Sequence, residues 1–158
     1  MKIYDRIKKD HESARAVIKE IKATEAGDAG SRTLLFDHFK LDMWAHHKVE
    51  EAVFYSYLRS GEAMFSVAIE AINEHHMANG MIEELDTFPV DSEEWLVKFK
   101  AVCELIEHHM DEEEDEFFEK ARKILDDATA EKMGAAFDER KAAMLEALTP
   151  LSIKKKAA

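Results

Sequence analysis

The chain has 158 residues, 46% of them hydrophobic and 35% charged, which suits one folded domain with an apolar core and excludes a disordered polymer. Its formal net charge of −12 argues against nucleic acid and anionic membrane surfaces as partners, because both carry negative charge. The single cysteine excludes an internal disulfide framework and any multi-cysteine zinc or iron–sulfur site within one chain.

Neither a signal peptide nor a membrane span is visible in the sequence. The first twelve residues lack a continuous apolar segment, and no uncharged apolar run approaches the roughly 18 residues of a membrane helix. We therefore expect a soluble protein of the cytoplasm.

Residues that break helices are sparse, and they divide the chain into five predicted helices. The first covers about residues 2–25 and repeats its apolar positions every three or four residues. The second begins at Ser31 as its N-cap and reaches about Arg59, before Gly61. The third covers about residues 62–86.

The last two helices are bounded by capping and proline signals. Asp91 and Glu94 have the spacing of a capping box and predict the start of the fourth helix, which ends near Leu125. The fifth is shorter, covers about residues 130–148 and ends before Pro150. A loose basic tail follows it.

Four long helices joined by short loops must lie antiparallel to their neighbours. The sequence therefore predicts an all-α fold, an up-down-up-down four-helix bundle with an additional C-terminal helix. We assign residues 1–126 to the bundle and residues 127–158 to a C-terminal helix and tail packed on the same domain.

An internal repeat supports this division. A shift of 63 residues places His46 and Glu50 on His109 and Glu113, together with several apolar residues, and a shift of 64 places His11 on His75. The periodicity that all amphipathic helices share explains why apolar residues match, but it does not explain why polar residues match.

The polar residues of the repeat form His-x-x-x-Glu pairs, whose two side chains lie one helical turn apart on the same side. Such a pair can reach one metal ion or two adjacent ones. A chain of this composition contains roughly one pair by chance. Four occur, in two overlapping couples: His46/Glu50 with His47/Glu51, and His108/Glu112 with His109/Glu113.

Each couple can direct only one pair inward, because adjacent residues sit about 100° apart around a helix axis. His109 and Glu113 continue the apolar face of the fourth helix. The repeat then selects His46 and Glu50 on the second helix, whose face continues to Tyr57. This second choice stays open, since the alternative pair lies on a nearly equivalent face.

The combination of inward histidines and glutamates predicts a metal site. One histidine on an apolar helix face is more often a hydrogen-bonded core residue. Two buried carboxylates are different, because burying each of them without a compensating cation costs several kcal/mol of free energy. No Lys or Arg lies near them on the same helix faces. The predicted metal ligands are His11, His46, Glu50, His75, His109 and Glu113.

Six ligands of this kind exceed what one tetrahedral zinc needs and suit two octahedral ions bridged by the carboxylates. Imidazole and carboxylate together favour iron, with manganese and zinc as substitutes. We expect two Fe ions with a bridging oxo or hydroxo group and about two open positions. The absence of Glu-x-x-His argues against the ferritin-like class, and the absence of His-Glu-x-x-His excludes a helical zinc protease.

The order of these residues resembles the hemerythrin-like, or HHE cation-binding, domain family over about residues 5–125. Similar local segments are Asp10-His11, HHKVEEAVFY from residue 46, Glu74-His75 and HMDEEEDEFF from residue 109. The resemblance implies a non-haem di-iron centre inside a four-helix bundle, held by the six residues named above. Ser56 and Glu119 depart from it, since the family often has proline there. No fifth histidine matches the extra terminal ligand of oxygen-carrying hemerythrins, which argues against simple reversible oxygen carriage.

The leading functional hypothesis is a di-iron protein that binds or senses a small molecule, namely dioxygen, nitric oxide or peroxide. One alternative is an enzyme with the same site that breaks down peroxide or reduces nitric oxide, which rapid turnover would reveal. Others are an iron store or sensor whose fold responds to metal, and a metal-free interaction module. The sequence favours no particular oligomeric state.

Several further residues allow two interpretations. Tyr4 packs in the core or approaches the metal, and Asn79 supports the His75 imidazole or bridges two helices. The acidic run 111–116, its predicted ligand aside, is expected to be solvated. The other histidines either support the ligands from behind or lie at the surface, and we expect most of them at the surface or at the rim of the site: His38, His47, His76 and His108.

Overall fold

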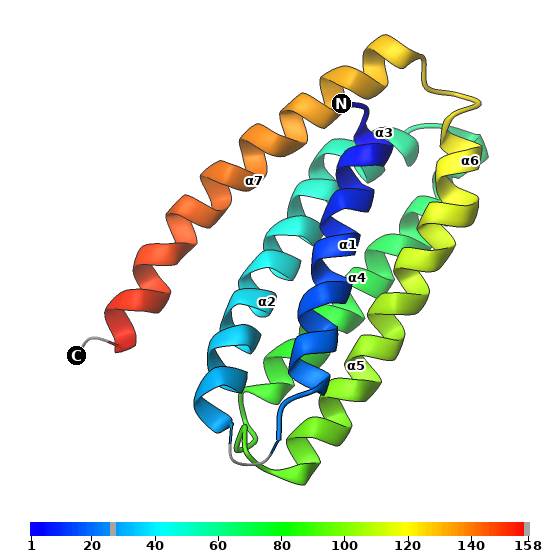
Figure 1. Ribbon diagram of the computed structural model, residues 1–158. Coiled ribbons are helices and arrows are strands. Elements are labelled where there is room, and N and C mark those ends of the chain that lie inside the picture. The colour runs from blue at the N-terminus through cyan, green and yellow to red at the C-terminus, as the bar shows by residue number, and fades with distance from the viewer. Residues whose placement is uncertain (26–27, 157–158) are drawn as a thin grey trace.

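The computed structural model describes residues 1–25 and 28–156, the last eight of these as backbone only. The described residues form helices and no strand. Four helical stretches make an antiparallel up-down-up-down bundle, and a fifth helix runs along the outside over the first two (Figure 1). The predicted fold class is confirmed.

The first two stretches lead up and down one side of the bundle. The first is α1, Ile3–Lys22. The second is one continuous helical rod made of α2 (Ala29–Glu50), a π-helical turn η1 (Glu51–Tyr55) and α3 (Ser56–Leu58).

The remaining stretches complete the bundle and add its outer helix. The third consists of a short 3₁₀ turn, η2 (Glu62–Met64), and α4 (Phe65–Leu85). The fourth is again a continuous rod of α5 (Glu93–Glu112), a π-helical turn η3 (Glu113–Phe117) and α6 (Phe118–Ala121). The outer helix is α7, Asp127–Lys156.

The start of the second stretch differs from the prediction. Ser31 is not the N-cap, because α2 already begins at Ala29 and the Arg32 N–H donates to the Asp28 carbonyl at 2.9 Å. The buried Arg32 side chain donates to Thr24 and to the carbonyls of Glu25 and Val90. These tertiary contacts hold the first turn of α2 in place, and no local capping signal reveals them.

The predicted capping box on the fourth stretch is also wrong. Ser92, and not Asp91, caps α5, since its hydroxyl oxygen accepts the Trp95 N–H at 3.1 Å. At its other end the fourth stretch stops at Ala121, where the chain turns so that Leu125 is buried against the core.

The outer helix is longer than expected at both ends. It begins at Asp127 and continues past Pro150 to Lys156, so the predicted stop and loose tail are wrong. A proline deprives a helix of one backbone hydrogen bond and bends it, but the helix can resume on the far side.

The core consists of two apolar clusters with a polar layer between them. One cluster includes Ile3, Phe54 and Phe118, and the other includes Phe36 and Phe99. Each of the four bundle stretches passes from one cluster to the other, and each carries buried histidine or glutamate where it crosses the gap. The fold therefore encloses a polar layer between two apolar clusters.

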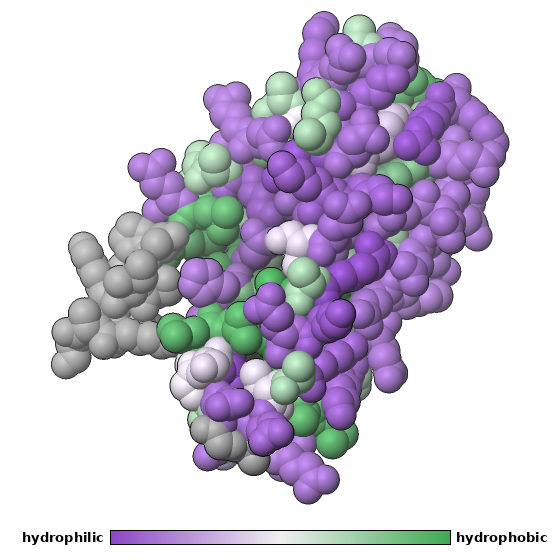
Figure 2. Space-filling view, in the orientation of Figure 1, coloured by the Kyte–Doolittle hydropathy of each residue, from purple (hydrophilic) through white to green (hydrophobic). Residues whose placement is uncertain are grey.

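The surface agrees with the acidic composition. Figure 2 shows that the face seen in Figure 1 is mostly hydrophilic. Among the described residues, no helix has both the length and the apolar character needed to cross a membrane.

The capping of α5 leads to a first prediction. Ser92→Ala removes the acceptor of the Trp95 N–H, so it should lower the free energy of unfolding by about 1 kcal/mol. Urea denaturation measures this change. The neighbouring Asp91→Ala variant is the control and should have a smaller effect, and equal losses in both variants would contradict the assignment of the cap.

Candidate metal centre

The structure brings all six predicted ligands into the polar layer. They come from every bundle stretch and are at most 3% exposed. Their positions are His11 on α1, His46 and Glu50 on α2, His75 on α4, His109 on α5, and Glu113 at the first position of η3.

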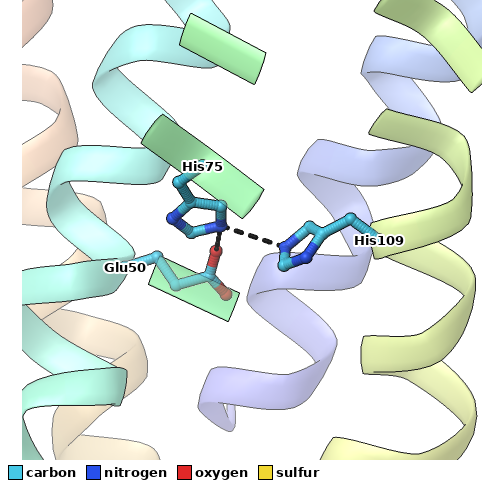
Figure 3. A group of neighbouring side chains, drawn as sticks. All are labelled: Glu50, His75 and His109. Carbon is cyan, nitrogen blue, oxygen red and sulfur yellow. Dashed lines mark hydrogen bonds and ion pairs between the residues drawn. The ribbon is translucent and has the colours of Figure 1, made fainter. Parts of the chain in front are cut away.

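Glu50 approaches the histidines of two helices. Its Oε2 atom is 3.3 Å from His46 Nε2 and 3.5 Å from His75 Nε2. His75 Nε2 is in turn 3.0 Å from His109 Nε2, as Figure 3 shows. The donor atoms of Glu50, His75 and His109 all lie within 4.8 Å of one another, close enough to hold one metal ion.

Glu113 lies against Glu50 and approaches two further histidines. Its Oε2 atom is 3.3 Å from His11 Nε2 and 4.0 Å from His109 Nε2. Its other oxygen accepts a hydrogen bond from the Tyr55 hydroxyl at 2.8 Å. The six side chains therefore form one continuous cluster, in which the ring centroids of His11 and His46 lie 5.2 Å apart and those of His75 and His109 lie 4.6 Å apart.

Several atoms of this cluster lack the hydrogen bonds that buried polar atoms normally have. Among the described residues, none hydrogen-bonds His11 Nε2, either carboxylate oxygen of Glu50, or Glu113 Oε2. A buried unpaired donor or acceptor costs about 1–3 kcal/mol, and a charged one costs more. These atoms all belong to residues facing one centre, and they are the kinds that ligate iron, manganese and zinc. The residues present therefore fit a metal group.

Each of the four histidines has a carboxylate on its outer side. Hydrogen bonds join Nδ1 to Glu114 for His11 at 3.0 Å, to Asp10 for His46 at 3.1 Å and to Glu74 for His109 at 2.7 Å. For His75, Glu51 Oε1 lies 3.4 Å from Nδ1 without forming a hydrogen bond. An ionised carboxylate only accepts, so it favours a proton on Nδ1 and leaves the Nε2 lone pair facing the centre. This is the arrangement in which metal-ligating histidines are normally held.

The close approach of His75 Nε2 and His109 Nε2 fits the same interpretation. If both rings carry their proton on Nδ1, two lone pairs face each other at 3.0 Å. Such a pair repels unless a proton or a cation lies between or beside the nitrogens. A metal ion shared with Glu50 would remove this repulsion.

Positive side chains stand behind the outer carboxylates. Lys48 Nζ is 2.8 Å from Glu51 Oε2, and Arg15 Nη1 is 2.7 Å from Glu114 Oε1. The contact with His11, followed by that with Arg15, lowers the pKa of Glu114 to about 2. Cations compensate the outer ring of carboxylates, whereas the two inner glutamates depend on the centre itself.

The two inner carboxyl groups have different pKa values. Burial, reinforced by the charge of Glu113, holds the pKa of Glu50 well above its usual value. For Glu113 burial acts in the same direction, but contacts with His11 and Glu50 outweigh it and its pKa lies below the usual value. Of the two carboxyl groups, Glu50 therefore has the higher affinity for a proton.

Burial also keeps the central imidazole of His75 neutral. It lowers the pKa of His75 well below its usual value, with help from the neighbouring His47 and His109. A neutral imidazole retains the lone pair that a metal needs.

The second helix buries both of its adjacent histidines. His47 is 1% exposed, so the expectation of a surface or rim position is wrong for it. Its ring stacks on His75 with centroids 4.1 Å apart, and its Nδ1 lies 2.9 Å from Asn79 Oδ1. Asn79 thus supports His47 and not His75. Two faces of α2 are buried because α4 covers His47 while α7 covers His46 through Phe137.

The π-helical turns explain a second difference. The turn η1 begins directly after Glu50, and η3 begins at Glu113, so each lies at the glutamate of a His-x-x-x-Glu pair. A π-helical turn contains an extra residue, which shifts the helix face that is buried. Tyr57, predicted on the face of Glu50, is therefore 46% exposed, whereas Phe54 and Tyr55 are buried. This shift carries the Tyr55 hydroxyl to Glu113, a contact that a regular helical spacing does not predict.

The other candidates are distributed as follows. His38, His76 and His108 are exposed, as expected. Tyr4 packs in the core against Phe54 and Phe118. Glu114 does not belong to a solvated acidic face, since it contacts His11, and only its place one residue after the predicted ligand hinted at this.

A profile of the hemerythrin HHE cation-binding domain matches residues 2–121 of the sequence. The chain belongs to this family. The HHE profile covers the whole bundle and ends at the last residue of α6, so α7 lies outside it.

The fold is shared with a solved HHE protein. The crystal structure of a hemerythrin HHE cation-binding domain-containing protein from Mycobacterium kansasii superposes with a TM-score of 0.77, at 21% sequence identity. The match covers 94% of this chain and 93% of that one, so the likeness extends beyond the four-helix bundle. No curated protein sequence matches the chain at a significant level.

The protonation of the HHE site leads to a second prediction. Glu50 has a raised pKa, and so does His11, where contacts with Glu113 and Glu114 outweigh the effect of burial. A metal must displace the protons that these raised values retain, so metal uptake should release protons and strengthen as the pH rises from 6 to 8. One proton per ion gives about a tenfold gain in affinity per pH unit.

Titration calorimetry in buffers of different ionisation enthalpy counts the protons released. An affinity that is flat across this pH range would contradict the assignment of a retained proton to the metal-free centre.

Proposed function

We propose that the chain is a non-haem di-iron protein of hemerythrin type, which binds or senses a small molecule at the iron centre. The observation that carries the proposal is the layer of buried, unpaired donor atoms on His11, Glu50 and Glu113, enclosed between two apolar clusters. Family membership adds cation binding as the shared property.

The donor set supports two ions better than one. His11 lies beside His46, His75 lies beside His109, and each glutamate approaches one histidine of both pairs: Glu50 approaches His46 and His75, and Glu113 approaches His11 and His109. Six protein ligands exceed one tetrahedral site and leave room at two octahedral ions. Iron is the metal that this mixture of imidazole and carboxylate suits best, with manganese and zinc as substitutes.

The protein's own residues determine what reaches the centre. When bound, iron supplies redox chemistry and positions for an added ligand. Apolar clusters lie on both sides of the layer and separate it from bulk water, so we expect only small molecules such as dioxygen, nitric oxide or peroxide to reach the centre. The Tyr55 hydroxyl holds one oxygen of Glu113 and, because burial followed by the Glu113 charge raises its pKa, keeps its proton there.

Iron content tests the proposal. The purified chain, reconstituted with ferrous iron without oxygen and then oxidised, should hold about two ions per chain and absorb in the near ultraviolet. Glu113→Ala should lower this to about one ion or fewer, because it removes a buried ligand of the cluster.

The matched control is Glu112→Ala, which removes the preceding glutamate, a residue that pairs with His108 at the surface. This variant should keep its iron. A preparation that takes up one zinc ion and shows no near-ultraviolet band after iron reconstitution would refute the di-iron proposal, and equal losses in both variants would refute the role of Glu113.

A further inference from the structure

Lys141 is a buried cation on the helix that lies outside the HHE profile. It is 5% exposed, although lysine is almost never buried without a partner. Its Nζ atom lies 2.5 Å from Asp10 Oδ2 on α1 and 2.8 Å from Asp42 Oδ1 on α2. One ammonium group of α7 thus ties together the two bundle helices that α7 covers.

The same Asp10 oxygen also contacts His46, one of the predicted metal ligands. Asp10 Oδ2 lies 3.1 Å from His46 Nδ1, while the second oxygen of Asp10 accepts from Arg6 at 2.5 Å. Lys141 and His46 therefore share one carboxylate oxygen.

A second side chain of α7 fixes the ring itself. Phe137 lies one turn before Lys141, is fully buried, and packs edge-on against His46 with ring centroids 5.8 Å apart. The Arg6 guanidinium lies over the Phe137 ring at 5.0 Å. Phe137 of the outer helix and the Asp10 carboxylate thus both pack against the His46 ring.

We propose that Lys141 is a positioning residue of the metal centre, which fixes the Asp10 carboxylate oxygen at His46 Nδ1 so that His46 keeps its proton on Nδ1 and presents Nε2 to the metal. The role of His46 as a ligand rests on the proposed function, whereas its tautomer is a property of the metal-free chain. Without Lys141, the shared oxygen of Asp10 loses one of the two contacts that fix its position, so it can move away from Nδ1 and the preference of His46 for one tautomer weakens. The outer helix thereby becomes part of the site.

The test compares Lys141→Met with Arg140→Met. Both variants remove one positive charge from neighbouring positions of α7, but Arg140 is exposed. Nitrogen-15 NMR of the metal-free protein reports the His46 tautomer directly. We expect Nδ1–H alone in the wild type and the Arg140 variant, and a mixture in the Lys141 variant. Ferrous iron should bind to the Lys141 variant about 10- to 100-fold more weakly.

Two further variants separate positioning from simple attachment of α7. Asp42→Asn weakens the other contact of Lys141 but leaves Asp10 untouched, so it should preserve the His46 tautomer and the iron affinity. Asp10→Asn should by itself reproduce the loss, and adding Lys141→Met to it should have little further effect. If Lys141→Met does not fold, the double variant Lys141→Met/Asp42→Asn takes its place, since it leaves no unpaired carboxylate at position 42.

The outcomes distinguish the two proposals. A wild-type tautomer and wild-type iron affinity in the Lys141 variant would overturn the positioning role while leaving the di-iron proposal intact. Equal losses in Lys141→Met and Asp42→Asn would also overturn it, because they would show that α7 acts only by packing. If the wild type binds no iron, the di-iron proposal fails, and the tautomer still decides whether Lys141 orients His46.

Discussion

The structure depends on one constraint, namely that carboxylates and imidazoles are buried in a layer between two apolar clusters. Glu50 and Glu113 are fully buried, and several of their oxygens have no hydrogen-bond partner among the described residues. Burying such groups is unfavourable unless something compensates their charge. A four-helix bundle is suited to this arrangement, because each helix can carry apolar residues at both ends and one or two ligands at the same height.

Charge compensation is arranged in shells around this layer. Each inward histidine has an outer carboxylate near its Nδ1 atom, and cations such as Arg15, Lys48 and Lys141 stand behind three of these carboxylates. Three of the four outer carboxylates therefore have a cation that the protein supplies. Among the described residues no lysine or arginine pairs with the inner glutamates, which is why the proposed cations belong at the centre and not at its edge.

The sequence predicted the fold and the members of the central cluster because both depend on local periodicity. Apolar residues at helical spacing and the repeat of His-x-x-x-Glu indicate which residues share a helix face. Periodicity could not predict which additional faces become buried. His47 is enclosed because α4 covers it, and Glu114 is partly enclosed because α1 lies beside it, so neither follows from its own helix. The π-helical turns add a further limit, because they change the spacing on which the prediction relies.

By itself, the sequence determined that the chain is an antiparallel helical bundle and that paired histidines and glutamates face its interior, since spacing along one helix decides both. The tertiary structure alone decided how these groups meet. It places the Tyr55 hydroxyl on Glu113 and brings Lys141, 131 residues away in the chain, to Asp10. Such contacts join helices whose relative rotation and height are set by side-chain packing, and packing between distant segments leaves no periodic signal in either of them.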